Sequence, residues 1–236
     1  MTESRSKIAA VIPAYNEEKH IGDVVRRTQP KVDKILVVDD GSQDQTADRA
    51  REAGAEVIVH EQNRGKGETI KTGLRHWLAT AGPASGGLDR QVDFVIILDA
   101  DGQHRPEEIE RFIAVALSPE APKLVLGNRM NDVSSMPLVR RMVNRWMSGR
   151  ISAACGQEIP DTQCGFRLLH RQLIPELLGG AARFDYETEM LIVASRKGFQ
   201  IASVPVSTVY SDEVSSIHPV RDTIRFFKLM RQYKKP

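Results

Sequence analysis

Two aspartates stand one residue apart where an apolar run in the middle of the chain ends. Asp99 and Asp101 close the run of residues 94–98, and Gln103 adds a further side-chain oxygen. Carboxylates at the C-terminal end of a buried strand lie where open α/β sheets bind ligands. Ligands that are all oxygen suit Mg²⁺ or Mn²⁺ shared with a diphosphate. The spacing therefore predicts a metal–diphosphate site, although an Asp-x-Asp motif alone is short and is equally typical of an acidic turn.

Three further loops carry polar side chains at the ends of predicted strands. Residues 13–17 offer an aromatic ring and a carboxylate, residues 39–42 offer two acids, and residues 65–67 place a lysine between two glycines. The acids can accept hydrogen bonds from ribose hydroxyls or from a base edge. Each loop alone is more often a simple turn, but four such loops in successive strand-to-helix connections indicate a ligand site.

The glycine-rich phosphate loops of the common nucleotide-binding folds are missing. The chain has no Gly-x-Gly-x-x-Gly after its first predicted strand and no Walker-type loop. Their absence argues against a dinucleotide-binding or P-loop protein. Acids with a metal site instead fit a nucleotide diphosphate whose phosphates are held by the cation.

The elements that must position these loops alternate between strands and helices. The predicted strands are residues 7–13, 34–38, 56–60, 94–98 and 123–126. The predicted helices are residues 16–28 with Asn16 as the N-cap, 45–53, 68–78 and 106–117, and residues 83–88 read as a flexible loop. This alternation predicts an α/β fold with a mostly parallel, doubly wound sheet and flanking helices.

Composition and charge exclude several classes of protein. The chain has 236 residues, of which 41% are hydrophobic and 27% are charged, as is typical of a soluble globular protein. A net charge of +2 is too small to indicate nucleic acid as a partner. Cys155 and Cys164 show no metal-ligand spacing, and we expect no structural disulfide. No window approaches the roughly 20 apolar residues of a membrane span, so we expect a cytoplasmic protein without a transmembrane segment.

Four motifs together resemble the family 2 glycosyltransferases of the GT-A fold, and most of all the dolichyl- and polyprenyl-phosphate sugar synthases. The matching segments are residues 11–18, 37–46, 63–67 and 98–103. The similarity runs from about residue 8 to about residue 229. It implies a single GT-A domain over residues 1–236, with a donor-binding half at about 7–127 and an acceptor half at about 128–236.

The activity that this resemblance implies is an inverting, metal-dependent hexose transfer. The donor would be a nucleotide-diphosphate sugar of the GDP-mannose or UDP-glucose type, and the acceptor a polyprenyl or dolichyl phosphate. Matched position by position, the residues that would line the nucleotide are Pro13, Tyr15, Glu17, Val38, Asp40, Lys66 and Ala100. The residues that would hold Mg²⁺ or Mn²⁺ are Asp99, Asp101 and Gln103.

The second half of the chain carries the residues that the resemblance assigns to the acceptor. Gly127-Asn128-Arg129, the block of residues 160–168 and the segment of residues 184–190 match the family there. The residues that would act at the reacting groups are Arg129, Asp161 and Glu189, and those that would bind the acceptor phosphate are Arg129, Arg140, Arg167 and Arg221.

Alternatives remain open for several of these residues. Asp161 could be a base or an orienting group, because a phosphate monoester with a second pKa of about 6 is already ionised and hardly needs a base. Arg167 could instead pair with Asp161 or Glu189. Asp185 is more typical of a helix N-cap than of a catalytic acid.

Two amphipathic segments bear on the membrane. In residues 138–147 the apolar side chains fall on one half of a helix and the arginines on the other, and the segment from Pro219 has a similar pattern. Such helices either pack on a core or lie on anionic lipid. The serine–lysine pair usual before the last helix of the synthases is absent, and Arg221 is the nearest replacement. We expect a peripheral protein at the cytoplasmic membrane face, with or without a separate membrane protein as partner.

Two other functions compete with this one. The same donor half would serve a family 2 glycosyltransferase that acts on a soluble or different lipid acceptor. A non-catalytic sugar-nucleotide-binding protein is a further alternative, but such a protein would be expected to lose its metal ligands. The intact set of Asp99, Asp101 and Gln103 argues against it.

Overall fold

The computed structural model describes residues 6–79, 92–130, 138–179 and 186–207. In this part of the chain a seven-stranded sheet has the order β3-β2-β1-β4-β6-β5-β7. The strands are β1 (Ile8–Ala14), β2 (Lys34–Asp39), β3 (Glu56–Val59), β4 (Phe94–Ile97), β5 (Leu124–Asn128), β6 (Arg167–His170) and β7 (Ile201–Pro205). Only β6 runs antiparallel to its neighbours β4 and β5 among these strands, so the predicted mostly parallel sheet is confirmed.

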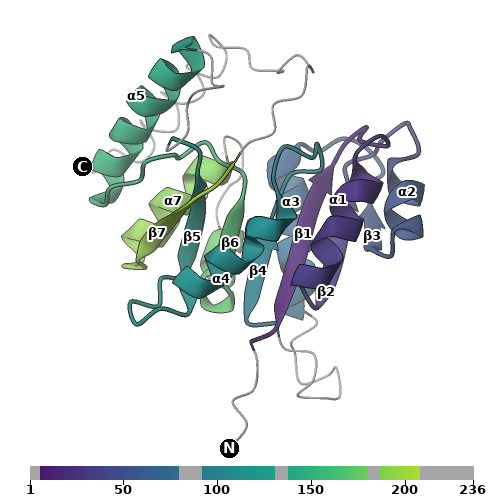
Figure 1. Cartoon of the computed structure of the whole chain (residues 1–236), viewed down its shortest axis with the longest axis horizontal. Coiled ribbons are helices and arrows are strands. Elements are labelled where there is room, and N and C mark those ends of the chain that lie inside the picture. Colours follow the sequence, from purple (N-terminus) through teal and green to yellow (C-terminus); the bar gives the residue numbers. More distant parts are fainter. Residues whose placement is uncertain (1–5, 80–91, 131–137, 180–185, 208–236) are drawn as a thin grey trace, which may run out of the picture.

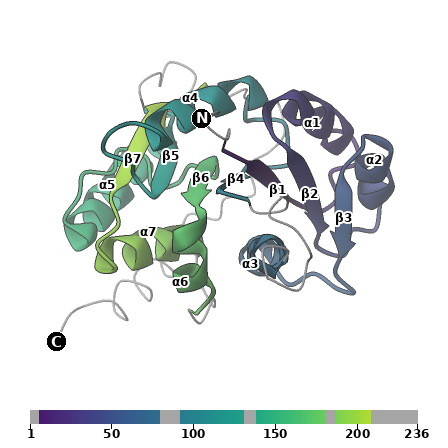
Figure 2. The same cartoon turned by 90° about the horizontal axis from the view of Figure 1, so that it is seen from below.

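Helices cover both faces of the sheet (Figures 1 and 2). They are α1 (Ile21–Thr28), α2 (Thr46–Glu52), α3 (Lys66–Ala79), α4 (Ile109–Ala116), α5 (Leu138–Cys155), α6 (Ile174–Leu178) and α7 (Tyr186–Arg196). Single turns of 3-10 helix precede or follow some of them, at Gln29–Lys31, Pro106–Glu108 and Arg171–Leu173. Apolar residues of α1, α2 and α4 pack on one face, and those of α3, α5, α6 and α7 pack on the other.

The apolar strands explain this double covering. In β1, Ala9 and Val11 belong to the core cluster under α3, whereas Ala10 and Ile12 belong to the opposite cluster. A strand buried on both faces reads as a continuous apolar run, which is why the sequence indicated it. Helix α3 comes very close to β1, because a Cβ at Gly73 would lie 2.5 Å from Val11 Cγ1.

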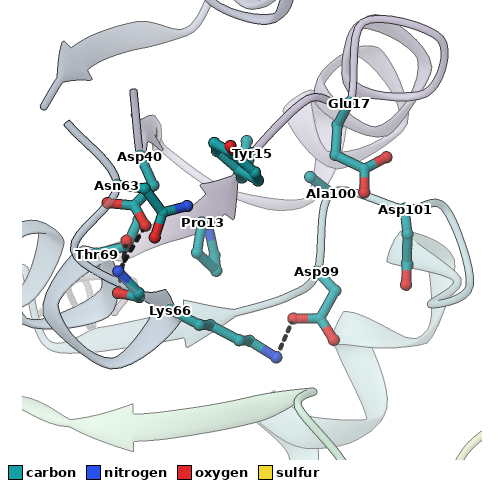
Figure 3. A pocket seen from close by; sticks show the side chains of 12 residues that line it. Pro13, Tyr15, Glu17, Asp40, Asn63, Lys66, Thr69, Asp99, Ala100 and Asp101 are labelled. Carbon is teal, nitrogen blue, oxygen red and sulfur yellow. Dashed lines mark hydrogen bonds and ion pairs between the residues drawn. The ribbon is translucent and has the colours of Figure 1, made fainter. Parts of the chain in front are cut away.

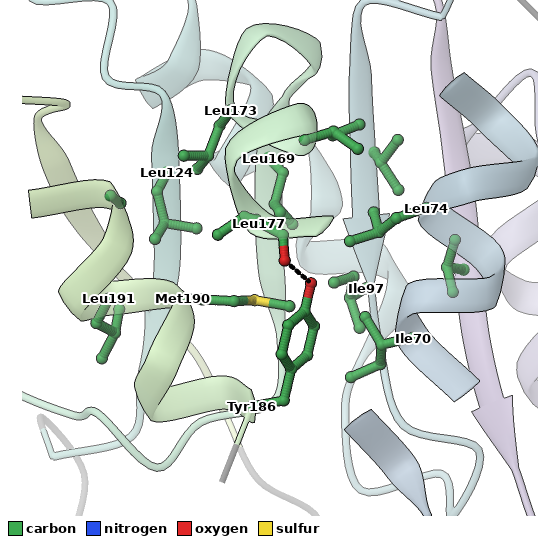
Figure 4. Packing of buried hydrophobic residues seen from close by; sticks show 14 of the residues in the cluster. Ile70, Leu74, Ile97, Leu124, Leu169, Leu173, Leu177, Tyr186, Met190 and Leu191 are labelled. Carbon is green, nitrogen blue, oxygen red and sulfur yellow. Dashed lines mark hydrogen bonds between the residues drawn. The ribbon is translucent and has the colours of Figure 1, made fainter. Parts of the chain in front are cut away.

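The core cluster under α3 continues across β4, β6 and β5 to α6 and α7 (Figure 4). Tyr186, at the start of α7, packs among apolar side chains of α3 and α6. Its hydroxyl donates a hydrogen bond to the Leu177 carbonyl at 3.3 Å, so the buried phenol is satisfied. Cys155 and Cys164 are buried free thiols, in agreement with the expected lack of a disulfide.

Several predicted boundaries need correction. Asn16 does not cap a helix: α1 begins at Ile21, and Asn16 has a left-handed φ of 56°. Its side chain accepts a hydrogen bond from Gln43 N at 2.9 Å and its backbone N–H donates to Ser42 Oγ at 2.9 Å, so it joins two loops instead. Helix α3 begins at Lys66, two residues before the predicted start. The loop at residues 83–88 and the helix predicted from Pro219 lie outside the described residues.

Candidate active site

A pocket of about 370 Å³ opens where β1, β2 and β4 end and α3 begins. Of the seven residues predicted to line the nucleotide, six line this pocket: Pro13, Tyr15, Glu17, Asp40, Lys66 and Ala100. The seventh, Val38, is fully buried in the core, so its predicted place at the pocket wall is wrong. Asp99 and Asp101 lie on the opposite side from Asp40 (Figure 3).

Lys66 brings the charges of the pocket together. Its Nζ lies 2.6 Å from Asp99 Oδ1 and 2.8 Å from Glu187 Oε1. Burial lowers the pKa of Lys66, but the two carboxylates more than offset this and the pKa is raised overall. Burial likewise raises the pKa of Asp99, yet Lys66 and His104 leave it far below its ordinary value. Both groups are therefore charged at neutral pH.

Asp101 differs from Asp99 because no cation contacts it in the described structure. Its Oδ1 accepts a hydrogen bond from the Gln103 backbone N–H at 2.9 Å. Burial, and then the nearby charge of Asp99, raise the pKa of Asp101 above its usual value. Asp99 and Asp101 repel each other when both are ionised, and a divalent cation bound between two such carboxylates relieves that repulsion.

The donor set fits Mg²⁺ or Mn²⁺. Apart from the ion pair with Lys66, the buried Asp99 Oδ1 accepts no hydrogen bond from the residues that the structure describes. No cluster of three His, Cys, Asp or Glu side chains suited to a metal occurs in the described ranges, so protein carboxylates alone would not close the shell. Asp99 and Asp101, with Gln103 and the oxygens of a diphosphate, would supply an oxygen set of the kind in which Mg²⁺ is usually shared with a phosphate ligand.

Asp40 is fixed by three donors on the far side of the pocket. Its carboxylate accepts hydrogen bonds from the backbone N–H groups of Arg64 at 2.9 Å and Gly65 at 2.7 Å. His60 Nδ1 lies 2.7 Å from Asp40 Oδ1. The turn after β2 thereby holds a buried carboxylate directly at the pocket wall.

Arg129, which follows β5, and Asp161, in the loop before β6, form a buried ion pair. Arg129 Nε lies 2.7 Å from Asp161 Oδ2 and Nη2 lies 3.0 Å from Oδ1, and the Arg129 backbone N–H also donates to Oδ2. Burial raises the pKa of Asp161, but Arg129 and Asn144 more than reverse this and the pKa lies below its usual value. A carboxylate so engaged favours the orienting role over that of a base.

The block that carries Asp161 also packs against Asp99. A Cβ at Gly165 would lie 2.7 Å from Asp99 Oδ2 and 3.1 Å from Glu187 Oε1. A larger residue at this position would force the side chains of Asp99 and Glu187 to shift, since 2.7 Å is inside van der Waals distance. The block of residues 160–168 thus reaches Asp99 through Gly165.

Arg167 and Glu189 are not where the sequence placed them. Arg167 is fully buried, and its guanidinium donates to the carbonyls of Thr162, Cys164 and Glu187. It forms no ion pair with Asp161 or Glu189, and its burial argues against the predicted contact with an acceptor phosphate. Arg167 instead ties the loop before β6 to α7.

Glu187, which the sequence reasoning missed, contacts Lys66 where Glu189 was expected. The resemblance pointed to the correct segment, but two residues along a helix turn a side chain by about 200°. Glu189 is buried, 6% exposed. The side chain of Arg140 and the residues Arg221 and Asp185 lie outside the described part of the chain.

Helix α5 exposes an apolar strip. Leu138 and Met142 are 74% and 72% exposed, and Val143 and Trp146 are exposed by 40% and 45%, with Arg141 and Arg145 exposed alongside. Its other face is buried, and Asn144 on that face donates to Asp161 Oδ1 at 3.0 Å. In the described ranges, no helix is both long enough and apolar enough to cross a membrane.

A family model, related protein sequences and solved structures each match this chain over most of its length. The model of glycosyl transferase family 2 matches residues 9–178. The chain is 31% identical over 228 residues to a UDP-N-acetylglucosamine–dolichyl-phosphate N-acetylglucosaminyltransferase of Methanococcus voltae, covering 87% of this chain and 86% of that one. It is 29% identical to an undecaprenyl-phosphate 4-deoxy-4-formamido-L-arabinose transferase of Enterobacter sp., covering 84% of this chain and 59% of the relative.

Among solved structures, the glucosyl-3-phosphoglycerate synthase of Mycobacterium tuberculosis in complex with UDP has a similar fold. The TM-score is 0.72 at 25% identity, and the match covers 98% of this chain and 82% of that chain. The same synthase has also been solved with Mn²⁺, UDP and glucosyl-3-phosphoglycerate, where the TM-score is 0.67 at 23% identity.

Proposed function

The chain belongs to glycosyl transferase family 2, and on that premise we propose that it transfers a sugar from a uridine-diphosphate sugar to the phosphate of a polyprenyl lipid, with inversion at the anomeric carbon. It is a glycosyltransferase with the GT-A fold. The observation that carries the proposal is the charge arrangement of the pocket. Lys66 pairs with Asp99 and Glu187, and Asp101 lies beside them with a raised pKa, at the strand ends where a diphosphate would bind.

The donor is the half of the proposal with more support. Asp40 lines the end of the pocket away from Asp99 and Asp101, so a nucleoside there would place its phosphates toward Lys66. The N-acetylglucosaminyltransferase relative is named for a UDP sugar, and the similar solved structure holds UDP. Both support uridine over the GDP-mannose alternative. The transferred sugar would lie between the diphosphate and the block of residues 160–168.

The reaction needs charge neutralisation more than it needs a base. A Mg²⁺ or Mn²⁺ ion held by Asp99, Asp101 and Gln103 would act as a Lewis acid on the leaving diphosphate. Lys66 adds a fixed positive charge next to the same phosphates. The acceptor phosphate is already ionised near neutral pH, so Asp161 would orient Arg129 rather than remove a proton.

The acceptor would approach along helix α5. Two relatives are named for dolichyl-phosphate and undecaprenyl-phosphate acceptors. An apolar strip flanked by arginines suits the surface of an anionic membrane, where the arginines meet lipid headgroups. Asn144 links this helix to Asp161. We therefore place the reaction at the cytoplasmic membrane face, with or without a separate membrane protein.

The direct test supplies the full chain with Mn²⁺ and labelled UDP-N-acetylglucosamine, UDP-glucose or GDP-mannose, with and without polyprenyl phosphate. Label extracted into organic solvent only when UDP sugar, lipid and metal are all present supports the proposal. Water-soluble labelled product with a phosphorylated small acceptor would support the alternative of a soluble acceptor. Donor binding without transfer to any acceptor would support a non-catalytic protein. Asp101→Ala, which removes a proposed metal ligand, should give no transfer and serves as the negative control.

A further inference from the structure

His60 is a buried residue behind the pocket that the proposed reaction does not use. It follows β3, its side chain is 5% exposed, and it is not part of the pocket wall. Its Nδ1 lies 2.7 Å from Asp40 Oδ1 and its Nε2 lies 3.0 Å from Thr72 Oγ1 on α3. A side chain buried this deeply with partners on both ring nitrogens has one fixed orientation.

We propose that His60 is a positioning residue for Asp40, and that it makes this carboxylate selective for uracil over guanine. The inference rests on the proposed function, because it takes the ligand at Asp40 to be a nucleoside base. It goes beyond that function by naming the residue that sets the preference and the chemical reason for it.

The argument begins with the acceptor capacity of Asp40. A carboxylate has about four lone-pair sites, two on each oxygen. Oδ1 is approached by His60 Nδ1 and by the Arg64 backbone N–H, so both of its sites are used. Oδ2 accepts from the Gly65 backbone N–H at 2.7 Å. One acceptor site, on Oδ2, is left for a ligand.

The two candidate bases differ in what they would offer to this site. Uracil has a single N–H on its Watson–Crick edge, at N3, with a carbonyl on each side. Guanine has adjacent donors at N1 and at its exocyclic amino group, and these pair best with both oxygens of a carboxylate. Because Oδ1 is already saturated, guanine would leave one buried donor unpaired, and an unpaired buried donor weakens binding strongly.

Thr72 completes the arrangement from the other side of the ring. A carboxylate only accepts hydrogen bonds, so Nδ1 of His60 must be the donor to Asp40. The Thr72 hydroxyl can donate to Nε2 or accept from it, so it holds the ring in place in either protonation state. Thr72 and His60 therefore connect α3, the end of β3 and the turn after β2.

The test compares three substitutions of His60 in the full chain. The amide nitrogen of asparagine occupies nearly the position of Nδ1, and that of glutamine nearly the position of Nε2. His60→Asn should keep the bond to Asp40, His60→Gln should lose it, and His60→Phe should lose both bonds while it fills the space. Calorimetric titration with UMP, UDP, GMP and GDP in EDTA measures base recognition without metal and without turnover.

Wild-type protein should bind UMP at least tenfold more tightly than GMP. His60→Phe and His60→Gln should bind UMP about tenfold more weakly and show a smaller preference over GMP, since one site on Oδ1 is released. His60→Asn should stay within about threefold of wild type, and a melting temperature for each variant separates loss of fold from loss of recognition. Thr72→Val is a milder second variant that should weaken UMP binding in the same direction.

The outcomes separate this inference from the function on which it rests. If wild-type protein binds none of the four nucleotides, the proposed function itself fails. If wild-type protein prefers UMP and folded His60→Gln and Thr72→Val keep the same affinity and preference, the role of His60 is wrong while the donor assignment stands. A wild-type preference for GMP would also overturn the inference.

Discussion

The amine of Lys66 lies 2.6 Å from Asp99 Oδ1, so the first turn of α3 places a cation on a carboxylate that the proposed metal would also use. The pair has two consequences. It keeps Asp99 ionised, which metal binding requires, and it adds a positive charge that opposes the metal. The Lys66 side chain is 43% exposed, so solvent screens part of this effect. A diphosphate arriving with the metal would give Lys66 a new partner.

Replacing Lys66 with methionine should separate these effects. Lys66→Met removes a positive charge beside two carboxylates, so nucleotide-free protein should bind Mn²⁺ more tightly, by about tenfold, or about 1.4 kcal/mol. The same variant should lose most transfer activity, because the leaving diphosphate loses a fixed positive charge. Electron paramagnetic resonance titration of free Mn²⁺ gives the first value and a transfer assay gives the second. Lys197→Met, which removes an exposed lysine paired with Glu176, is the matched control.

Unchanged or weaker Mn²⁺ binding by Lys66→Met would show that Lys66 does not compete with the metal at Asp99. Equal changes in Lys197→Met would point to a general effect of net charge instead. Each variant has one positive charge fewer than wild type, so the comparison isolates the position of that charge.

The raised pKa of Asp101 predicts that, without metal, the protein becomes less stable as the pH rises. Burial and the charge of Asp99 raise its pKa, so the folded protein holds this proton more tightly than the unfolded chain does. The resulting stabilisation is complete below about pH 4 and is lost as the pH rises through the raised pKa. Asp101→Asn cannot ionise, and in EDTA at pH 7 it should therefore melt at a higher temperature than wild type.

The same variant tests the metal site. Mn²⁺ should raise the melting temperature of wild type and leave Asp101→Asn nearly unchanged, because binding to the folded state alone stabilises it. Asp48→Asn, at an exposed residue paired with Arg51, should respond to Mn²⁺ as wild type does. Equal stabilisation of Asp101→Asn by Mn²⁺ would remove Asp101 from the metal site.

The donor side of this pocket could be predicted from the sequence, and the reason is local. Pro13 lies at the end of β1, and Asp40 and Asp99 follow β2 and β4 within two residues. Parallel strands bring such ends to one edge of the sheet. The strands themselves read as continuous apolar runs because both faces are buried. Strands β6 and β7 gave weaker signals: β6 begins and ends with Arg167 and His170, and β7 is only half-buried.

Residues that reach the site through tertiary packing could not be found in this way. Glu187 meets Lys66 across more than a hundred residues of chain, and no local pattern sets it apart from Glu189. His60 looked like the last residue of a predicted strand. Arg167 matched a family motif at a position whose side chain points into the interior. Whether each of these side chains faces the pocket or the interior depends on tertiary packing, which no local sequence pattern reveals.

The buried pair of Arg129 and Asp161 predicts a large loss of stability when one partner is removed. Arg129→Met would leave Asp161 charged and unpaired in the interior, at a cost of about 3–5 kcal/mol. Urea unfolding at pH 7 measures the free energy of unfolding. Arg49→Met, which removes an exposed arginine paired with Glu52, should change it by less than about 1 kcal/mol.

The pH dependence of this loss has a definite sign. Although burial raises the pKa of Asp161, Arg129 lowers it below the unfolded value, so the pair stabilises the protein above about pH 4. That contribution disappears as the pH falls through the lowered pKa. The difference between wild type and Arg129→Met should therefore shrink in acid. A difference that is constant from pH 7 to the acid limit of the folded state would mean that Asp161 does not carry the effect.

The exposed apolar strip of helix α5 predicts that the protein binds to anionic membranes. Leu138→Glu and Met142→Glu each place a charge where the proposed surface would enter the lipid interface, and each should reduce co-sedimentation with phosphatidylglycerol vesicles by about tenfold. Leu117→Glu is the matched control. Leu117 is likewise an exposed leucine, at 57%, but it follows α4 and lies outside the strip on α5. Binding should weaken with salt, since Arg141 and Arg145 flank the strip. If Leu138→Glu, Met142→Glu and Leu117→Glu all bind as wild type does, α5 is not the membrane-facing element, and the lipid acceptor must reach Asp161 by another route.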